Sequence, residues 1–255
     1  AWLAYLDSVM PVTSVFVVHG NIRDLHLLPA ADGKWTLQRT PAALREMFAR
    51  SGMPTMLYCS ALHGLTVQPG STEADVPAIL GPFADAVGTV PSMAVLAELV
   101  DRVTGHREHP CALVVDYLSQ VAAHGPGTGP PDDDPRPLYL AILRAAHEAV
   151  AHPRRGGPRS PLRNPVVVIV DRPGDLPAWL LSGDGIRQAP VPTPDLLTRS
   201  NAVKALAPAL FRGDEELAES ERIGIAKRFT DATHGLTLRA LLAIVQLRSD
   251  AGIPA

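Results

Sequence analysis

The sequence predicts a three-layer α/β fold, in which a parallel sheet lies between two layers of helices. Short runs rich in Val and Ile alternate along the chain with longer segments of helical periodicity. Most of these runs are continuously apolar rather than apolar at every second residue, which indicates strands that are covered on both faces. Beyond residue 190 only helical patterns follow. The chain is therefore expected to combine an α/β domain with a helical C-terminal part.

The strands and helices of the α/β domain can be assigned in chain order. The apolar runs expected to form the parallel strands are residues 14–18, 55–59, 112–115 and 166–170, and a weaker pattern predicts a fifth strand over residues 186–190. Helical spacing of apolar residues predicts helices over residues 42–50, 93–103 and 138–152. The pair Asp32-Gly33 lies between two short apolar segments and predicts a two-residue hairpin turn.

The C-terminal part is expected to be a small, all-helical lid. Amphipathic spacing recurs over residues 194–211, 215–233 and 236–249. The simplest division is an α/β domain over residues 1–192 and a lid subdomain over residues 193–255.

Composition excludes several classes of protein. Of the 255 residues, 46% are hydrophobic and 19% are charged, which is typical of a globular chain and excludes wholly disordered, collagen-like and coiled-coil proteins. The longest aliphatic run, residues 166–170, is far too short to span a membrane. A net charge of -3 argues against nucleic acid and anionic membranes as partners. Cys59 and Cys111 lie in apolar runs and are expected to be buried. We expect a soluble, cytoplasmic protein.

Several motifs, in their order along the chain, resemble those of an AAA+ ATPase module. Residues 112–116 read ALVVD and are similar to the family's Walker B strand, whose aspartate, here Asp116, would hold Mg²⁺ through water at the carboxyl end of the strand. Tyr117 stands where the family has the glutamate that polarises the attacking water. The segment NPVVVIVDRP resembles the sensor 1 strand and places Asp171 beside the nucleotide.

The resemblance continues to the end of the chain. The segment THGLTLRALLAIV is similar to the family's lid signature, in which Arg239 matches the sensor 2 arginine. Arg187 lies near the place of the arginine finger that reaches into a neighbouring subunit. Both arginines are also explained as ordinary surface charges. The resemblance implies the strand order 5-1-4-3-2 of P-loop NTPases and a homo-oligomeric ring, built through the parent chain, that acts on a protein substrate or partner.

One motif of the family is missing. A phosphate loop requires G-x-x-x-x-G-K-[ST] between the first strand and the first helix, so that backbone N–H groups and a lysine surround the phosphates. After the first strand the chain reads HGNIRDLHLL, with one glycine, Gly20, and no Lys-Ser or Lys-Thr pair. Any altered phosphate loop would lie around residues 19–24, with Gly20 and Asn21 among its contacts.

The hypothesis that follows is a degenerate AAA+ module, structural or regulatory in ring assembly, whose hydrolysis is supplied by another module. The chain begins at Ala1 rather than Met and ends directly after a helical pattern, so we expect an excised first module of a longer ATPase. Two alternatives stay open. In one, ATP and Mg²⁺ bind through the altered loop, with Asp116 and Arg239 as contacts; in the other, the chain is a protein-interaction domain without nucleotide.

Other arrangements of reactive residues are weaker. His106 and His109 flank Glu108 in an expected loop, where they could hold a metal ion or form a solvated loop. A serine hydrolase of the α/β class would need G-x-S-x-G, which the sequence lacks.

Overall fold

The structure is a computed structural model of the chain and describes residues 2–30, 33–71, 75–121, 134–153, 161–214 and 216–251. The chain divides into two compact units. The first, here the α/β unit, comprises Ala1–Ile22 and Leu44–Val191. The second, here the helix–hairpin unit, comprises Arg23–Ala43 and Pro192–Ala255. The sequence did not predict that residues 23–43 group with the C-terminal helices.

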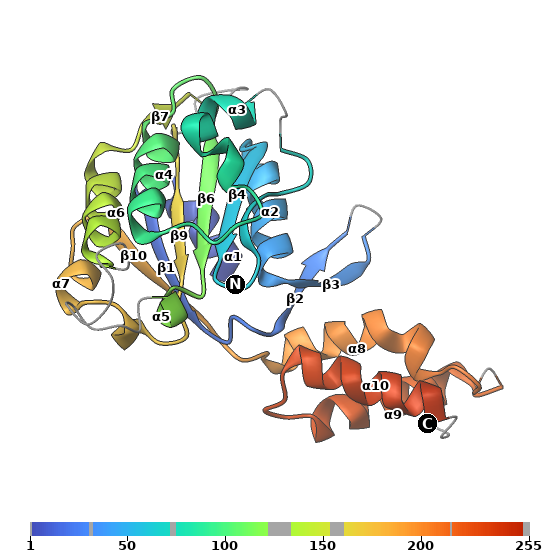
Figure 1. The fold of residues 1–255 in the computed structure, drawn as a ribbon. Coiled ribbons are helices and arrows are strands. Elements are labelled where there is room, and N and C mark those ends of the chain that lie inside the picture. The colour runs from blue at the N-terminus through green and yellow to red at the C-terminus, as the bar shows by residue number, and fades with distance from the viewer. Residues whose placement is uncertain are drawn as a thin grey trace. The chain divides into compact units, whose positions relative to one another are not determined.

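A six-stranded sheet forms the centre of the α/β unit (Figure 1). In the order in which they lie side by side, its strands are β10 (Ile186–Val191), β1 (Val15–Gly20), β9 (Val166–Ile169), β6 (Cys111–Asp116), β4 (Thr55–Ser60) and β5 (Gly64–Val67). The first five are parallel and correspond to the predicted strands, so the expected order 5-1-4-3-2 is confirmed. The antiparallel edge strand β5 was not predicted.

Helices cover both faces of this sheet, which confirms the three layers. Successive residues of β1 point to opposite faces: Val15 and Val17 belong to one buried cluster, and Phe16 and Val18 to another. The second face is covered by α1 (Trp2–Val9) and α2 (Thr40–Ser51). The elements on the first face are α3 (Asp75–Leu80), η1 (Gly81–Ala86), α4 (Met93–Gly105), α5 (Leu118–Val121), α6 (Arg136–Glu148) and α7 (Ala178–Leu181). The short helix η3 (Pro173–Asp175) lies between β9 and α7 along the chain.

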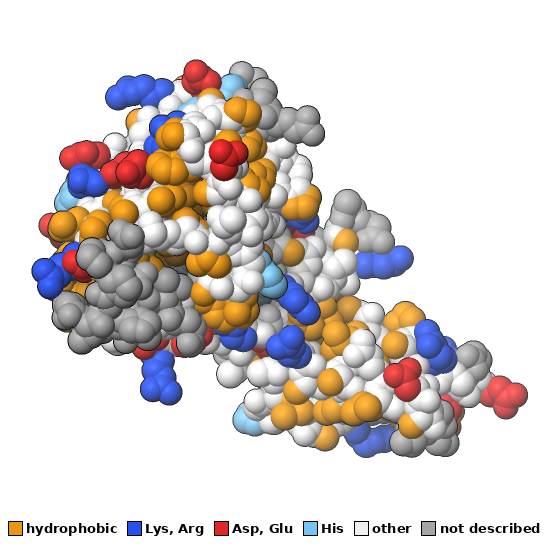
Figure 2. Space-filling view, viewed as in Figure 1, with side chains coloured by type: hydrophobic (Ala, Val, Ile, Leu, Met, Phe, Trp, Pro, Cys, Tyr) orange, Lys and Arg blue, Asp and Glu red, His pale blue; other side chains and the backbone are white. Residues whose placement is uncertain are grey.

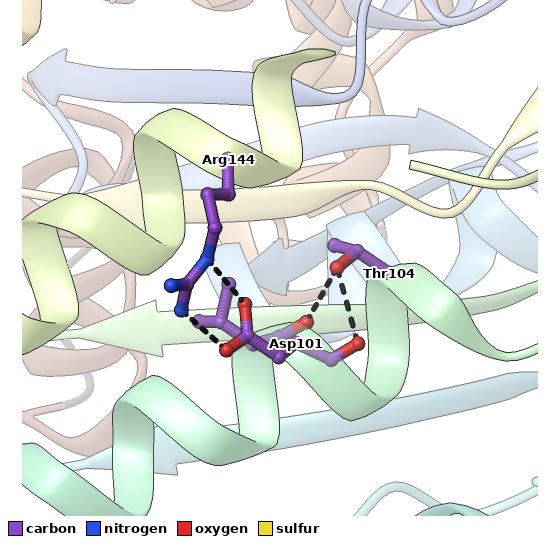
Figure 3. A network of polar contacts seen from close by, with 4 residues as sticks. Asp101, Thr104 and Arg144 are labelled. Atoms are coloured by element: carbon purple, nitrogen blue, oxygen red, sulfur yellow. Dashed lines mark hydrogen bonds and ion pairs between the residues drawn. The ribbon is translucent and has the colours of Figure 1, made fainter. Parts of the chain in front are cut away.

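A surface ion pair joins α4 to α6 (Figure 3). Arg144 donates from Nε to Oδ1 of Asp101 at 3.3 Å and from Nη2 to Oδ2 at 2.5 Å. The Thr104 hydroxyl donates to the Val100 carbonyl within α4 at 2.8 Å. Both side chains of the ion pair are exposed, so the pair contributes at most about 1 kcal/mol. Apolar burial, rather than this pair, holds the two helices on the sheet.

The helix–hairpin unit has a core of its own. Its helices are α8 (Leu196–Leu210), α9 (Glu219–Ala232) and α10 (Leu238–Ala251), and its strands are β2 (Leu25–Pro29) and β3 (Trp35–Arg39). The buried side chains of Val203, Leu241 and Val245 lie at its centre. Leu27 and Leu37 of the hairpin pack against this cluster. The hairpin therefore helps to form the core of the unit.

Three predicted boundaries are corrected. The predicted two-residue hairpin turn is too short, because Pro29 pairs with Trp35 and residues 30–34 connect the two strands. Asp32 itself lies outside the described residues. Helix α6 ends at Glu148 because Ala149 is extended, and Ala151–His152 forms a short strand, β7, that pairs with β8 (Leu162–Arg163). Helix α9 begins only at Glu219, because Ala218 is extended and donates its N–H to Oε2 of Glu221 at 3.0 Å.

Both cysteines are buried, as predicted. Burial raises the pKa of Cys59 to about 12, so its thiol stays protonated at neutral pH. The thiol of Cys111 donates to the Val103 carbonyl at 3.6 Å. Both side chains act as small apolar groups of the core.

Charges of both signs are interspersed on the face of the molecule drawn in Figure 2. This distribution agrees with the small net charge of the chain. Within the part of the chain that the structure describes, no helix is long and apolar enough to cross a membrane.

Candidate functional site

Three of the predicted site residues lie at the ends of neighbouring strands. Gly20 is the last residue of β1 and Asp116 the last of β6, while Asp171 follows β9, which lies between them in the sheet. The strands are parallel, so all three residues meet at the carboxyl edge of the sheet. Ligands of open α/β sheets bind at this edge. The candidate site is therefore the carboxyl edge of β1, β9 and β6.

Asp116 is held in place by hydrogen bonds to both carboxylate oxygens. Its side chain is only 2% exposed. The Tyr58 hydroxyl on β4 donates to Oδ2 at 2.6 Å, and the Tyr117 N–H donates to Oδ1 at 2.7 Å. Tyr117 has a φ of 58°, a left-handed conformation that is uncommon for a residue other than glycine. Strained backbone of this kind is found most often at functional sites.

Asp171 lies on a loop that is fixed through its backbone. Its N–H donates to Oγ of Ser119 at 3.2 Å, and that hydroxyl donates to Oδ2 of Asp175 at 2.8 Å. The same carboxylate oxygen accepts the N–H of Arg172 at 2.9 Å. The side chain of Asp171 is exposed at the edge of the sheet.

The segment that follows β1 is bonded to β10. Asn21 donates its N–H to the Val191 carbonyl at 2.9 Å, and Ile22 donates its N–H to the Gly20 carbonyl at 2.8 Å. Gly20 has a φ of 95°, and a Cβ at this position would lie 2.8 Å from the Val191 oxygen. Gly20 is therefore required by the close approach of two backbone segments. Burial lowers the pKa of the neighbouring His19, which favours its neutral imidazole.

Asp24 caps helix α10, a role that the sequence did not indicate. Its carboxylate accepts the N–H groups of Leu238 at 2.9 Å and Arg239 at 2.8 Å. It also accepts the N–H of Leu25 at 2.7 Å. Asp24 is 4% exposed, so these bonds are shielded from water. A buried carboxylate thus occupies the N-terminus of α10, where the helix dipole favours an anion.

These contacts do not fit a phosphate loop. In such a loop a helix begins directly after the first strand, and its N–H groups point at the phosphates. Here β1 leads into the hairpin of β2 and β3, and the next helix, α2, begins at Thr40. The N–H groups of Asn21 and Ile22 are bonded to carbonyl oxygens of the chain itself. The backbone of the segment after β1 therefore follows a different course from that of a phosphate loop.

The two predicted arginines, Arg187 and Arg239, belong to different units of the chain. Arg187 is exposed on β10, at one edge of the sheet, and its Nη1 donates to the Ile186 carbonyl at 3.3 Å. Arg239 belongs to the helix–hairpin unit, where its side chain is exposed on α10. Arg187 is near the start of β10, so it is not part of the cluster at the carboxyl edge of the sheet.

A mostly parallel central sheet in the order 5-1-4-3-2, with helices on both faces, defines a Rossmann-like or P-loop-like α/β domain. Comparison with family models agrees: residues 1–192 match the family described as AAA+ chaperone, N-terminal Rossmann-like domain. The chain belongs to this family, which confirms the AAA+ resemblance. No curated protein matches the chain.

Proposed function

We propose that this chain is a structural or regulatory module of a larger ATP-dependent remodelling ATPase, and that another module supplies the hydrolysis. The observation that carries the proposal is the course of the chain after β1. The N–H groups of Asn21 and Ile22, which would face phosphate in a working loop, are bonded within the protein. Without charge-assisted contacts from such a loop, affinity for a triphosphate is expected to be weak or absent.

The Asp24 carboxylate supports the same proposal. In the family that the chain resembles, the sensor 2 helix of the lid contacts the nucleotide. Here the N-terminus of the corresponding helix, α10, is bonded to Asp24 through Leu238 and Arg239. An anion that belongs to the chain therefore stabilises this helix without a bound phosphate. The helix–hairpin unit is expected to stay assembled whether or not nucleotide is present.

Family membership supports the assembly and the partners that we propose. The AAA+ chaperone family suggests oligomers and protein substrates in general. We extend this to a cytoplasmic homo-oligomeric ring of the parent chain, with Arg187 as a contact to the neighbouring subunit. Arg187 is exposed on an edge strand of the sheet, where a neighbour can reach it. Sedimentation of the parent protein with Arg187→Ala, compared with Arg136→Ala on α6, is expected to show weaker assembly for the first variant alone.

A second candidate function is nucleotide binding through an altered loop. The left-handed φ of Tyr117, directly after the buried Asp116, favours it, because backbone strain tends to persist where a site is in use. In this case Asp116 would hold the water shell of Mg²⁺ and Gly20 and Asn21 would lie near the phosphates. The hydrogen bonds already made by Asn21 argue against this alternative.

Calorimetric titration of the chain with Mg-ATP and Mg-ADP separates the two candidates. The proposal predicts no saturable heat at millimolar nucleotide. Binding tighter than about 0.1 mM, or about 5.5 kcal/mol, that disappears in Asp116→Asn would contradict it and establish the second candidate. Asp85→Asn, at an exposed aspartate, is the matched control and should behave as the unaltered chain. A thermal melt of each variant shows that the fold is retained.

A further inference from the structure

A group of metal-ligating side chains lies at the end of the sheet opposite the candidate site. The loop between α4 and β6 carries His106, Glu108 and His109, and one donor atom from each lies within 4.8 Å of the other two. Strand β6 separates this loop from Asp116 by roughly 17 Å at about 3.3 Å per residue. In Figure 1 the loop is at the end of the sheet where β7 is labelled, while α5 marks the other end. The group is therefore independent of the carboxyl edge.

The backbone of this loop is held by one buried amide. Asn164, which is fully buried, donates from Nδ2 to the carbonyls of Val103 and His106, both at 2.9 Å. Its Oδ1 accepts the N–H of Cys111 at 3.1 Å, where β6 begins. The ring of His152 on β7 also bonds the His106 carbonyl through Nε2 at 3.1 Å. The loop is thus fixed at both ends, so His106 has a defined position.

His106 also has an unsatisfied ring nitrogen. Its Nε2 is buried and has no hydrogen-bond partner among the described residues. Buried polar atoms nearly always have a partner, so one without any calls for an explanation. A cation bound at His106 Nε2 would give this nitrogen a partner.

We propose that His106, Glu108 and His109 bind one Zn²⁺ ion, with water as the fourth ligand. Two imidazoles and one carboxylate are a ligand set that zinc accepts. Zinc–nitrogen bonds of about 2.0–2.1 Å place tetrahedral ligands about 3.4 Å apart. The present donors must therefore approach one another by about 1.4 Å or less, a shift that rotation of two exposed side chains, Glu108 and His109, can provide. The ion would clamp the loop that leads into the central strand β6.

Zinc binding by the tag-free, chelator-treated chain tests this site. Equilibrium dialysis against Zn²⁺ is expected to give one ion per chain with a Kd of micromolar order. At free Zn²⁺ one hundred times the Kd, the thermal midpoint should rise by roughly 5 to 10 °C. His109→Ala and Glu108→Gln are the informative variants, because both side chains are exposed and neither change should disturb the fold. His234→Ala, at an exposed histidine of the helix–hairpin unit, is the matched control.

The zinc affinities of the variants decide whether His106, Glu108 and His109 form a zinc site. The proposal predicts that His109→Ala and Glu108→Gln weaken zinc binding by about 100-fold or more, since loss of even an outer-shell partner costs 10- to 100-fold. His234→Ala should bind zinc as the unaltered chain does. Co²⁺ bound in place of zinc should show the intense visible absorption of a four-coordinate ion, and lose it in His109→Ala. A Kd weaker than about 0.1 mM, or equal affinity in all variants, would overturn the proposal.

Discussion

The capping of α10 by Asp24 leads to the most specific prediction about stability. The substitution Asp24→Ala removes the acceptor for the N–H groups of Leu238 and Arg239, of which Leu238 is buried. Loss of an N-cap costs about 0.5–2 kcal/mol, and an unsatisfied buried donor costs about 1–3 kcal/mol. Two helix N–H groups lose their acceptor and the carboxylate is only 4% exposed, so we expect the free energy of unfolding to fall by about 3 kcal/mol. Asp24→Asn keeps an acceptor oxygen and should cost about 1 kcal/mol.

A second N-cap in the same unit provides the control. Asp195 caps α8 through one bond, from the Thr198 N–H at 2.7 Å, and is exposed. Asp195→Ala should therefore cost about 1 kcal/mol. Denaturant unfolding measures both losses, and hydrogen exchange at Leu238 and Arg239 should accelerate in Asp24→Ala alone. The reasoning is refuted if the two alanine variants are equally stable, or if exchange at the start of α10 does not change.

Three further predictions concern single side chains. Burial lowers the pKa of His26 from 6.5 to about 4, so the unfolded chain takes up a proton below pH 6.5 that the folded chain excludes. The contribution of His26 to the free energy of unfolding should be fully present above pH 6.5, fall by roughly 3 kcal/mol between pH 6.5 and 4, and stay constant below pH 4. Denaturant unfolding at several pH values should show this fall in the unaltered chain and not in His26→Gln. Gly33→Ala should lower the free energy of unfolding by about 1 kcal/mol because of its positive φ alone. In Gly20→Ala the added Cβ also meets a carbonyl oxygen of β10, so the loss should be about 3 kcal/mol. Equal losses of the two variants in denaturant unfolding would contradict this expectation. Tyr58→Phe removes the hydroxyl that donates to the buried Asp116 and should lower the free energy of unfolding by about 2 kcal/mol in the same assay. A loss below about 0.5 kcal/mol would show that this hydrogen bond contributes little to stability.

Much of the fold could be predicted because buried parallel strands leave a clear pattern. Four of the five parallel strands lie in short apolar runs, whereas β10 carries the exposed Arg187 and Gln188 and leaves a weaker pattern. The strand order came from the family resemblance. The edge strand β5, Gly64–Val67, was missed because only two of its residues are buried and it has no such run. The hairpin was predicted from Asp32-Gly33. Its packing against the C-terminal helices was not, because alternating Leu residues indicate a buried face but not the element that covers it.

The candidate site was predictable only where it depends on strand ends. Asp116 follows an apolar run, and the structure places it at the carboxyl edge as expected. Its partner Tyr58 is 58 residues away, and the bond depends on strand register, which the sequence does not reveal. Asp24 and Leu238 are 214 residues apart, so no local pattern could indicate the cap. That Asp116, Asp171 and Arg239 contact nucleotide stays a prediction.

The most direct test of the account is to observe the backbone amides of Asn21, Ile22 and Leu238 by NMR while Mg-ATP is added. The central claim is that these N–H groups are bonded within the protein and do not receive phosphate. We expect that their resonances do not shift at millimolar Mg-ATP. Saturable shifts of the Asn21 and Ile22 resonances on addition of Mg-ATP would contradict this expectation. They would show that the segment after β1 is a working phosphate site.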